Sequence, residues 1–267
     1  MNVTIIKPRK SQVDQIKELY SGRNLIWAMA VRDIKIRYTQ TILGWLWMFI
    51  NPLVNLVILV IVFSKIINLE VEGQDYTVFV ITGLMAWNYF STVVADVGNI
   101  IMNSRGLIQK VFFPKITIIL SRLVVGGVEL LATVLILIVI MIYKSQPPSF
   151  NIVYILLPLL LTTFLTLGIS LWVGAFVYRF RDIVHIVPIV LRILMFLSPI
   201  GYSIVGKDEV WYKFNPLVSC IELYRWCILP HYVVAQPILP GVLIVLFLVG
   251  SGFYLFARME QTIADHL

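Results

Sequence analysis

Charged residues are scarce in this chain. Only 13% of its 267 residues are Asp, Glu, Lys or Arg, whereas 60% are hydrophobic, and the mean hydropathy is +0.91. A soluble domain of ordinary composition has about 25% charged and about 45–50% apolar residues. One core cannot hide this much apolar surface. The composition therefore excludes an ordinary soluble protein and predicts that lipid surrounds much of the chain.

Signatures of nucleotide, nucleophile and metal sites are also missing. The sequence has no GxxxxGK[ST] phosphate loop, no GxSxG and no HExxH. Its three histidines, His185, His231 and His266, are scattered, and there is no CxxC. We therefore expect no catalytic residues, no metal and no cofactor in this chain. If the protein performs ATP-driven work, a partner subunit must bind ATP and Mg²⁺.

Only two cysteines are present, Cys220 and Cys227. If the stretch between them is helical, they are separated by a rise of about 10 Å. A disulfide requires Cα atoms within about 7 Å, so we expect two free, packed thiols. The first 23 residues contain no apolar run of signal-peptide length, and we expect no cleaved secretory signal.

Long apolar runs are what the sequence has in abundance. About 20 apolar residues cross a hydrocarbon core of about 30 Å. Six runs reach that length: Ile42–Ile67, Val78–Ile101, Ile116–Tyr143, Ile152–Tyr178, Ile183–Ile204 and Ile238–Ala257. The predicted fold is an all-α integral membrane protein with six transmembrane helices in residues 42–267. A cytoplasmic segment, residues 1–41, precedes them, and its stripe of Val13, Ile16, Leu19 and Tyr20 favours an interfacial helix.

Basic residues gather on one side of the predicted spans. Of the 21 Lys and Arg, 14 lie in the N-terminal segment, the second and fourth loops and the tail, five lie on the other side, and Arg122 and Arg192 fall within spans. The positive-inside rule then predicts a multi-pass protein with both termini in the cytoplasm. Contact with anionic lipid accounts for the net charge of +7, so we expect membrane lipids and no nucleic acid as partners.

The loop between the second and third spans, residues 103–115, combines cations with large apolar residues and has no acid. If it is helical, one face carries Leu107, Ile108, Val111 and Phe112, and the other carries Arg105, Gln109 and Lys110. Pro114 ends this short helix. Its apolar face needs a partner, which is either a groove on a cytoplasmic protein or the lipid headgroups.

Ionisable residues inside the spans are costly and therefore informative. Asp96 and Arg122 have similar predicted depths, so we expect them to form an ion pair. Glu129 lies on the same face of the third span as Arg122, and Arg192 of the fifth span is a possible partner for it. Structural pairing and a proton relay both explain these residues. Structural pairing is favoured, because no chain of protonatable groups connects the two membrane faces.

Two spans carry stripes of polar and aromatic residues at helical spacing. Trp47, Asn51 and Asn55 recur every four residues in the first span. The fifth span has a second stripe: Pro188, Arg192, Met195, Pro199 and Tyr202. A contact between helices and a water-filled lumen both explain such stripes.

The outer loop between the fifth and sixth spans is rich in aromatic residues, among them Trp211, Tyr212, Phe214, Tyr224 and Trp226. Within it Leu217–Leu229 is apolar but too short to span the membrane, and it contains Glu222 and Arg225. We expect re-entrant outer helices here, in a segment covering residues 205–232. A belt at the lipid headgroups and a lid over a transport pathway remain alternatives.

Four stretches in order resemble the permease subunits of ABC transporters that export O-antigen, teichoic acid and capsular polysaccharide. They are RDIKIRYTQTILGWLWMFINPL from Arg32, NSRGLIQKVFFPK from Asn103, YRFRDIVHIVP from Tyr178 and FLSPIGYS from Phe196. The resemblance implies a homodimer that works with two copies of a cytoplasmic ABC ATPase in the bacterial inner membrane. It also implies that the second loop, with Arg181 and Asp182, couples to the ATPase.

The same resemblance implies a lumen lined partly by Trp47, Asn51, Asn55, Arg192, Met195 and Tyr202. It implies an outer gate formed by Trp211, Tyr212, Phe214, Glu222, Tyr224, Arg225 and Trp226. Lipid-linked polysaccharide is then the substrate, with O-antigen the first candidate and teichoic acid or capsule next. Two other classes stay open: a polyprenyl-phosphate-dependent membrane glycosyltransferase and an ion-coupled transporter. The inner loops have only Asp182 as an acid between spans, which disfavours the first, and no inverted repeat supports the second.

Overall fold

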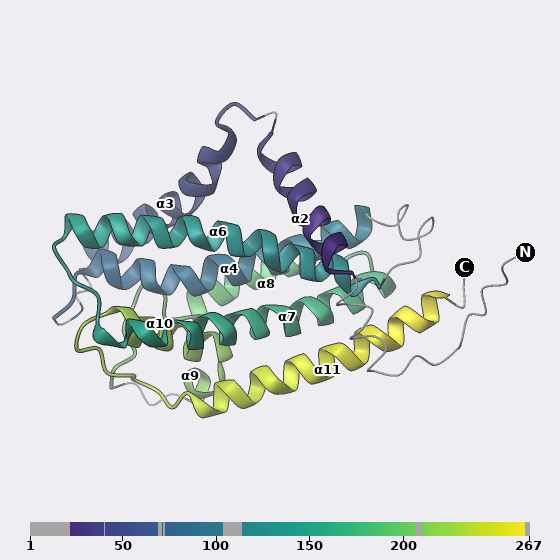
Figure 1. Ribbon diagram of the computed structural model, residues 1–267. Helices are drawn as coiled ribbons and strands as arrows, with labels where there is room; N and C mark the ends of the chain where they lie inside the picture. Colours follow the sequence, from purple (N-terminus) through teal and green to yellow (C-terminus); the bar gives the residue numbers. More distant parts are fainter. Residues whose placement is uncertain are drawn as a thin grey trace, which may run out of the picture.

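The computed structural model describes residues 22–39, 41–68, 71, 73–103, 114–206 and 210–264. All regular structure in these ranges is helical (Figure 1). The elements are α2 (Arg23–Tyr38), the turn η1 (Gly44–Leu46), α3 (Trp47–Leu59), its π-helical continuation η2 (Val60–Ile66), α4 (Tyr76–Asn103), α6 (Ile116–Tyr143), the turn η3 (Phe150–Tyr154), α7 (Leu156–Arg179), α8 (Ile183–Leu197), α9 (Val210–Phe214), α10 (Pro216–Ile228) and α11 (Leu239–Ala264).

Five helical segments of the described chain are long and apolar enough to cross a membrane. They are Gly44–Ile66, α4, α6, α7 and Leu239–Met259 of α11. The sixth expected span, Ile183–Ile204, contains only the 15-residue α8, which is about 22 Å long. Helical geometry ends at Ser198 because Pro199 follows, and the residue before a proline is disfavoured in a helix. The all-helical membrane fold is confirmed for the described residues, but the six-span arrangement is not.

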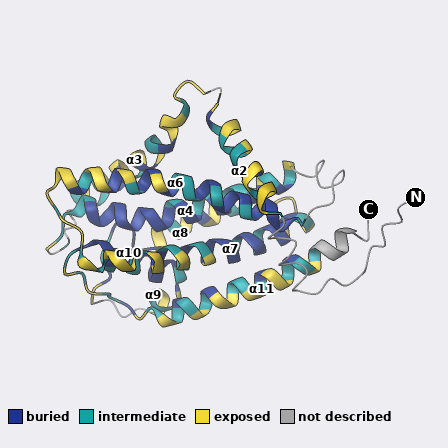
Figure 2. Ribbon diagram, viewed as in Figure 1, coloured by how far each residue is buried: buried dark blue, intermediate teal, exposed yellow. Residues whose placement is uncertain are grey.

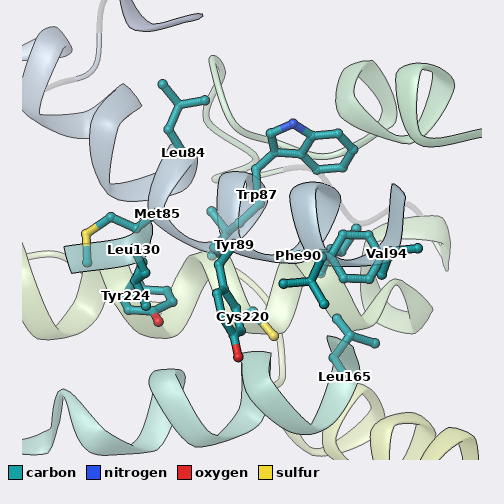
Figure 3. Close-up of a cluster of buried hydrophobic side chains, with 14 of the residues drawn as sticks. Leu84, Met85, Trp87, Tyr89, Phe90, Val94, Leu130, Leu165, Cys220 and Tyr224 are labelled. Carbon is teal, nitrogen blue, oxygen red and sulfur yellow. The ribbon is translucent and has the colours of Figure 1, made fainter. Parts of the chain in front are cut away.

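Helix α4 lies at the centre of the fold and is its most continuously buried element (Figure 2). It packs against α6, α7, α8 and α10. Figure 3 shows Tyr89 and Phe90 of α4 beside Leu165 of α7 and Cys220 of α10, all of which are buried. Cys220 and Cys227 are free and buried, in agreement with the prediction of two packed thiols.

The short helix α10 packs inside the bundle, against α4 and α7. Pro216 occupies its first turn, and the Asn215 side chain accepts a hydrogen bond from the Leu217 amide at 3.0 Å, which caps the helix. Most of its residues are buried, so protein shelters the backbone of α10 on most sides. The neighbouring α9 differs, because Trp211 and Phe214 are exposed there.

Helices α2 and α3 form an inverted V beside the bundle (Figure 1). One arm, α2, contacts α6, and the two arms are joined to α6 by a small cluster of Tyr38, Met48 and Ala132. The start of α2 and the end of α11 lie at the same end of the molecule (Figure 1). The stripe of Val13, Ile16, Leu19 and Tyr20, predicted to form an interfacial helix, lies outside the described residues.

Candidate functional site

Four charged residues from three helices form one cluster beside the first spanning segment. Arg122 of α6 pairs with Asp96 of α4, as predicted from their depths. Arg37 of α2 pairs with both Asp96 and Glu129, and Tyr38 donates a hydrogen bond to Glu129 Oε1 at 3.0 Å. Two cations and two carboxylates therefore neutralise one another where an unpaired charge would be costly.

Arg37, and not Arg192, is the partner of Glu129. Arg192, the partner expected from the sequence, is exposed on α8. Arg37 had been counted among the cations of the cytoplasmic segment, because periodicity along α2 says nothing about how deeply the helix inserts. A possible signal was the position of Arg37 and Tyr38 directly before the first apolar run.

A polar cavity of about 360 Å³ lies between α2, α3, α4 and α6. Trp47, Asn51 and Asn55 of α3 line it, together with Asn88 of α4 and the Arg37 and Glu129 side chains. The predicted stripe on the first span therefore borders this cavity, although Trp47 and Asn51 remain exposed. Val54 and Val57 of α3 do not line the cavity, and both are about half exposed.

Some polar side chains of this cavity join two helices, and one of them has a hydrogen-bonding atom without a partner in the described part of the chain. Asn55 Nδ2 donates a hydrogen bond to Asn88 Oδ1 at 3.5 Å, which joins α3 to α4. Asn88 Nδ2 is buried and has no partner among the described residues. The other proposed lining residues, Arg192, Met195 and Tyr202, do not border this cavity.

The chemistry of the polar cavity suits a neutral ligand rich in hydroxyl groups. Its amide and hydroxyl side chains both donate and accept hydrogen bonds. The indole of Trp47 offers an apolar face on which the C–H groups of a sugar can stack. Because its charges are balanced, the cavity presents no net charge to a phosphate group.

A second buried network fastens α10 to the end of α8. Arg225 and Glu222 are both fully buried and pair at 3.4 Å. Arg225 Nη2 donates to the carbonyls of Pro199 at 2.6 Å and Ile200 at 3.0 Å, in the segment that directly follows α8. The Arg225 guanidinium also lies 3.5 Å from the centroid of the Phe79 ring of α4, a cation–π contact.

Glu222 completes this network, here called the outer network, with further hydrogen bonds. It accepts from the Tyr232 hydroxyl at 2.9 Å and from the Ala235 amide at 2.8 Å. The residues proposed for the gate therefore form two groups. Glu222, Tyr224 and Arg225 anchor α10 and are buried, whereas the Trp211 and Phe214 rings of α9 are about half exposed. Tyr212 of α9 is also buried, and Trp226 of α10 is partly buried.

The proposed coupling residues Arg181 and Asp182 are exposed in the turn between α7 and α8. This turn adjoins the start of α6, since the Lys115 ammonium lies 5.8 Å from the centroid of the Tyr178 ring. The remaining proposed coupling residues, Arg105, Leu107, Ile108, Lys110, Val111 and Phe112, lie outside the described residues.

Comparisons with known proteins give one consistent result. A family model described as ABC-2 type transporter matches residues 24–229. The O-antigen export system permease protein RfbA of Myxococcus xanthus is 28% identical over 94% of this chain and 98% of its own length. The polysialic acid transport protein KpsM of Escherichia coli is 26% identical, over 77% of this chain and 81% of its own. The capsule polysaccharide export inner-membrane protein CtrC of Neisseria meningitidis serogroup B is 25% identical, over 76% and 78%.

The outer network generates a stability prediction. Arg225→Met leaves Glu222 buried without its cation and two carbonyls without a donor, so the folded protein should lose about 3–5 kcal/mol. Adding Glu222→Gln should recover part of the loss, because the remaining side chain is then neutral. Thermal unfolding in detergent measures both effects, with the exposed Arg179→Met as control. Equal unfolding temperatures for Arg225→Met and Arg179→Met would show that the network does not hold α10.

Proposed function

Because this chain belongs to the ABC-2 type transporter family, we propose that it exports lipid-linked polysaccharide, most directly O-antigen, across the bacterial inner membrane. It is a multi-pass membrane permease subunit and not itself an ATPase. Permeases of this family work with an ATPase partner, which supplies ATP hydrolysis. The export of polysaccharide is the activity named for the O-antigen, polysialic acid and capsule relatives.

One observation carries the choice of O-antigen over the other glycans. The O-antigen permeases of Myxococcus xanthus and Klebsiella pneumoniae are 28% and 29% identical over 94% and 76% of the chain, whereas the polysialic acid and capsule proteins are 26% and 25% identical over 77% and 76%. The polar cavity supports a hydroxyl-rich cargo of any of these kinds. We find no comparable support for a membrane glycosyltransferase, because no relative names that activity and the exposed turn before α8 offers a single acid, Asp182.

Orientation and coupling follow from the loop charges. We place both termini in the cytoplasm, together with the end of the bundle where α7 meets α8. Residues 103–115 and the turn of Arg181 and Asp182 then face the ATPase. The proximity of Lys115 to Tyr178 supports this arrangement, because it brings the two loops to the same end. The end that holds α10 then faces away from the cytoplasm.

A second copy of this chain completes the permease. Exposed apolar residues cover most of α8, and Arg192 is exposed among them. A guanidinium within a span cannot face hydrocarbon, so this face requires protein or a water-filled space against it. Two copies that meet along α8 would provide both a protein contact and a water-filled space. Two ATPase subunits would then bind on the cytoplasmic side. Arg192, Met195 and Tyr202 would then line a lumen between the copies.

The outer gate is best assigned to α9. Movement of α10 would break the buried contacts of Glu222 and Arg225, whereas the Trp211 and Phe214 rings are about half exposed. Apolar rings that narrow an exit can close it by excluding water. We therefore assign the movable part of the gate to α9 and the fixed support to α10.

Surface polysaccharide tests the proposed function. Cells that lack this chain should display none and should accumulate lipid-linked glycan inside. Replacing Asn51 and Asn55 by Leu together should lower export roughly tenfold, as expected for one or two lost hydrogen bonds to the cargo, while ATP hydrolysis by the partner persists. Val57→Leu, at an exposed position of α3 that does not line the cavity, is the control. Normal surface polysaccharide in cells without the chain would refute the proposal.

Cysteine crosslinking tests the dimer. In a Cys220→Ser, Cys227→Ser background, Ile189→Cys or Ile193→Cys should yield covalent dimers in membranes. These residues flank Arg192 on α8, and disulfides form only where Cα atoms approach within about 7 Å. Leu243→Cys on α11 is the control, since Leu243 and Ile189 are both 58% exposed. Equal crosslinking at α8 and α11, or none at α8, would contradict pairing along α8.

A further inference from the structure

A second cavity, here called the outer cavity, lies at the end of the bundle that holds α10. Its volume is about 460 Å³. Met85 of α4, Leu137 and Met141 of α6, Ile155 before α7 and Ile228 of α10 form its walls. It is separate from the polar cavity and shares no lining residue with it. Apart from the polar rim where α6 ends, its lining is apolar.

The wall at the end of α6 is a fixed turn. Ser145 adopts a left-handed conformation with φ 52°, and the Gln146 amide donates back to the Met141 carbonyl at 3.0 Å, which ends α6 as a Schellman motif does. Gln146 Nε2 then donates to Gln74 Oε1 at 3.0 Å, and Gln74 Nε2 donates to the Pro230 carbonyl at 2.5 Å. Because these bonds hold the turn in place, the cavity is preformed.

Water is a poor occupant for a space of this kind. Apolar cavities of much smaller volume stay dry and accept hydrocarbon ligands. Binding pockets for small molecules have volumes of about 300–1,000 Å³, so the outer cavity is large enough for part of a chain molecule. Beside the outer half of a membrane-spanning helix, the available apolar material is the hydrocarbon of the lipid.

The surroundings of the outer cavity favour lipid over a second copy of the chain. It opens along the face of α6 that carries Leu135, Ile138, Val139 and Ile142, all about half exposed or more. No charged residue interrupts this face, in contrast to Arg192 on α8. A face without charge is stable in hydrocarbon, whereas the α8 face is not.

Charges at the rim indicate the kind of headgroup. Lys144, which directly precedes Ser145, pairs with Asp75 at 3.0 Å. Burial opposes the ionisation of Asp75, but hydrogen bonds from Lys144 and from the Val78 and Thr77 amides outweigh it and lower the pKa of this carboxyl. One cation and one anion therefore stand side by side. They complement a zwitterionic headgroup better than a pyrophosphate, which would require cations that are not already neutralised.

We propose that the outer cavity binds an acyl chain of a zwitterionic glycerophospholipid, whose headgroup lies against the Lys144–Asp75 pair. The phospholipid fills the space between α6 and α10 and supports the outer network from the lipid side. Its assignment to the outer leaflet rests on the orientation given under the proposed function. The binding itself does not, because it requires neither cargo nor ATPase.

Native mass spectrometry of the full chain in detergent tests this site, with phosphatidylethanolamine, phosphatidylglycerol and a long polyprenyl phosphate as separate probes. Wild-type protein should retain phosphatidylethanolamine most strongly. Met141→Trp fills the cavity and should weaken this binding about tenfold, which corresponds to roughly two buried methylene groups. Leu243→Trp adds the same bulk to the exposed face of α11 and should have no effect. Asp75→Asn leaves Lys144 unneutralised and should shift the preference towards phosphatidylglycerol.

Two results would overturn the proposal. Equal phosphatidylethanolamine binding by the Met141→Trp and Leu243→Trp proteins would show that the cavity holds no acyl chain. Displacement of phosphatidylethanolamine by polyprenyl phosphate at equal concentration would assign the cavity to the lipid part of the cargo. If Met141→Trp does not elute as folded protein, Ile138→Trp at the half-exposed mouth replaces it. Surface export of polysaccharide is measured separately, so failure here leaves the proposed function standing.

Discussion

The pairing of charges within or beside hydrocarbon is the constraint on which this structure depends. Arg37 has the central position, because it contacts carboxylates on both α4 and α6. An unpaired charge at this depth costs roughly 2–3 kcal/mol or more, so α2 is held against the bundle by the need to neutralise Asp96 and Glu129. The polar cavity depends on the same contacts, since Arg37 and Glu129 form part of its wall.

The same rule explains features of both α10 and α8. At the outer end, Arg225 donates to two carbonyls in the segment that directly follows α8, and it thereby turns an interrupted helix into a fixed support. On α8, Arg192 is exposed among apolar side chains, which a single copy in lipid could not sustain. A fixed α10 and an exposed α8 face fit the proposed permease of two copies.

The features that could be predicted from the sequence are those indicated by residues within one helix or by their estimated depth. Five of the six long apolar runs correspond to spanning segments, and similar depths identified the Asp96–Arg122 pair. Contacts between distant segments could not be predicted in this way. No periodic pattern around Arg37 indicates how deeply α2 inserts. The end of α8 at Ser198 depends on Pro199 and on the guanidinium of Arg225, which lies 26 residues further along the chain. The coupling residues in the second loop remain a prediction.

Thermal unfolding of Arg37→Met, Glu129→Gln and the double variant tests the central claim most directly. If Arg37 holds α2 by neutralising buried carboxylates, Arg37→Met should lower stability by roughly 2–3 kcal/mol. Adding Glu129→Gln should then restore part of it, because the amide leaves no unpaired charge. Lys35→Met, an exposed cation on the same helix, should change little. Strictly additive losses in the double variant, or an Arg37→Met protein as stable as Lys35→Met, would contradict the account.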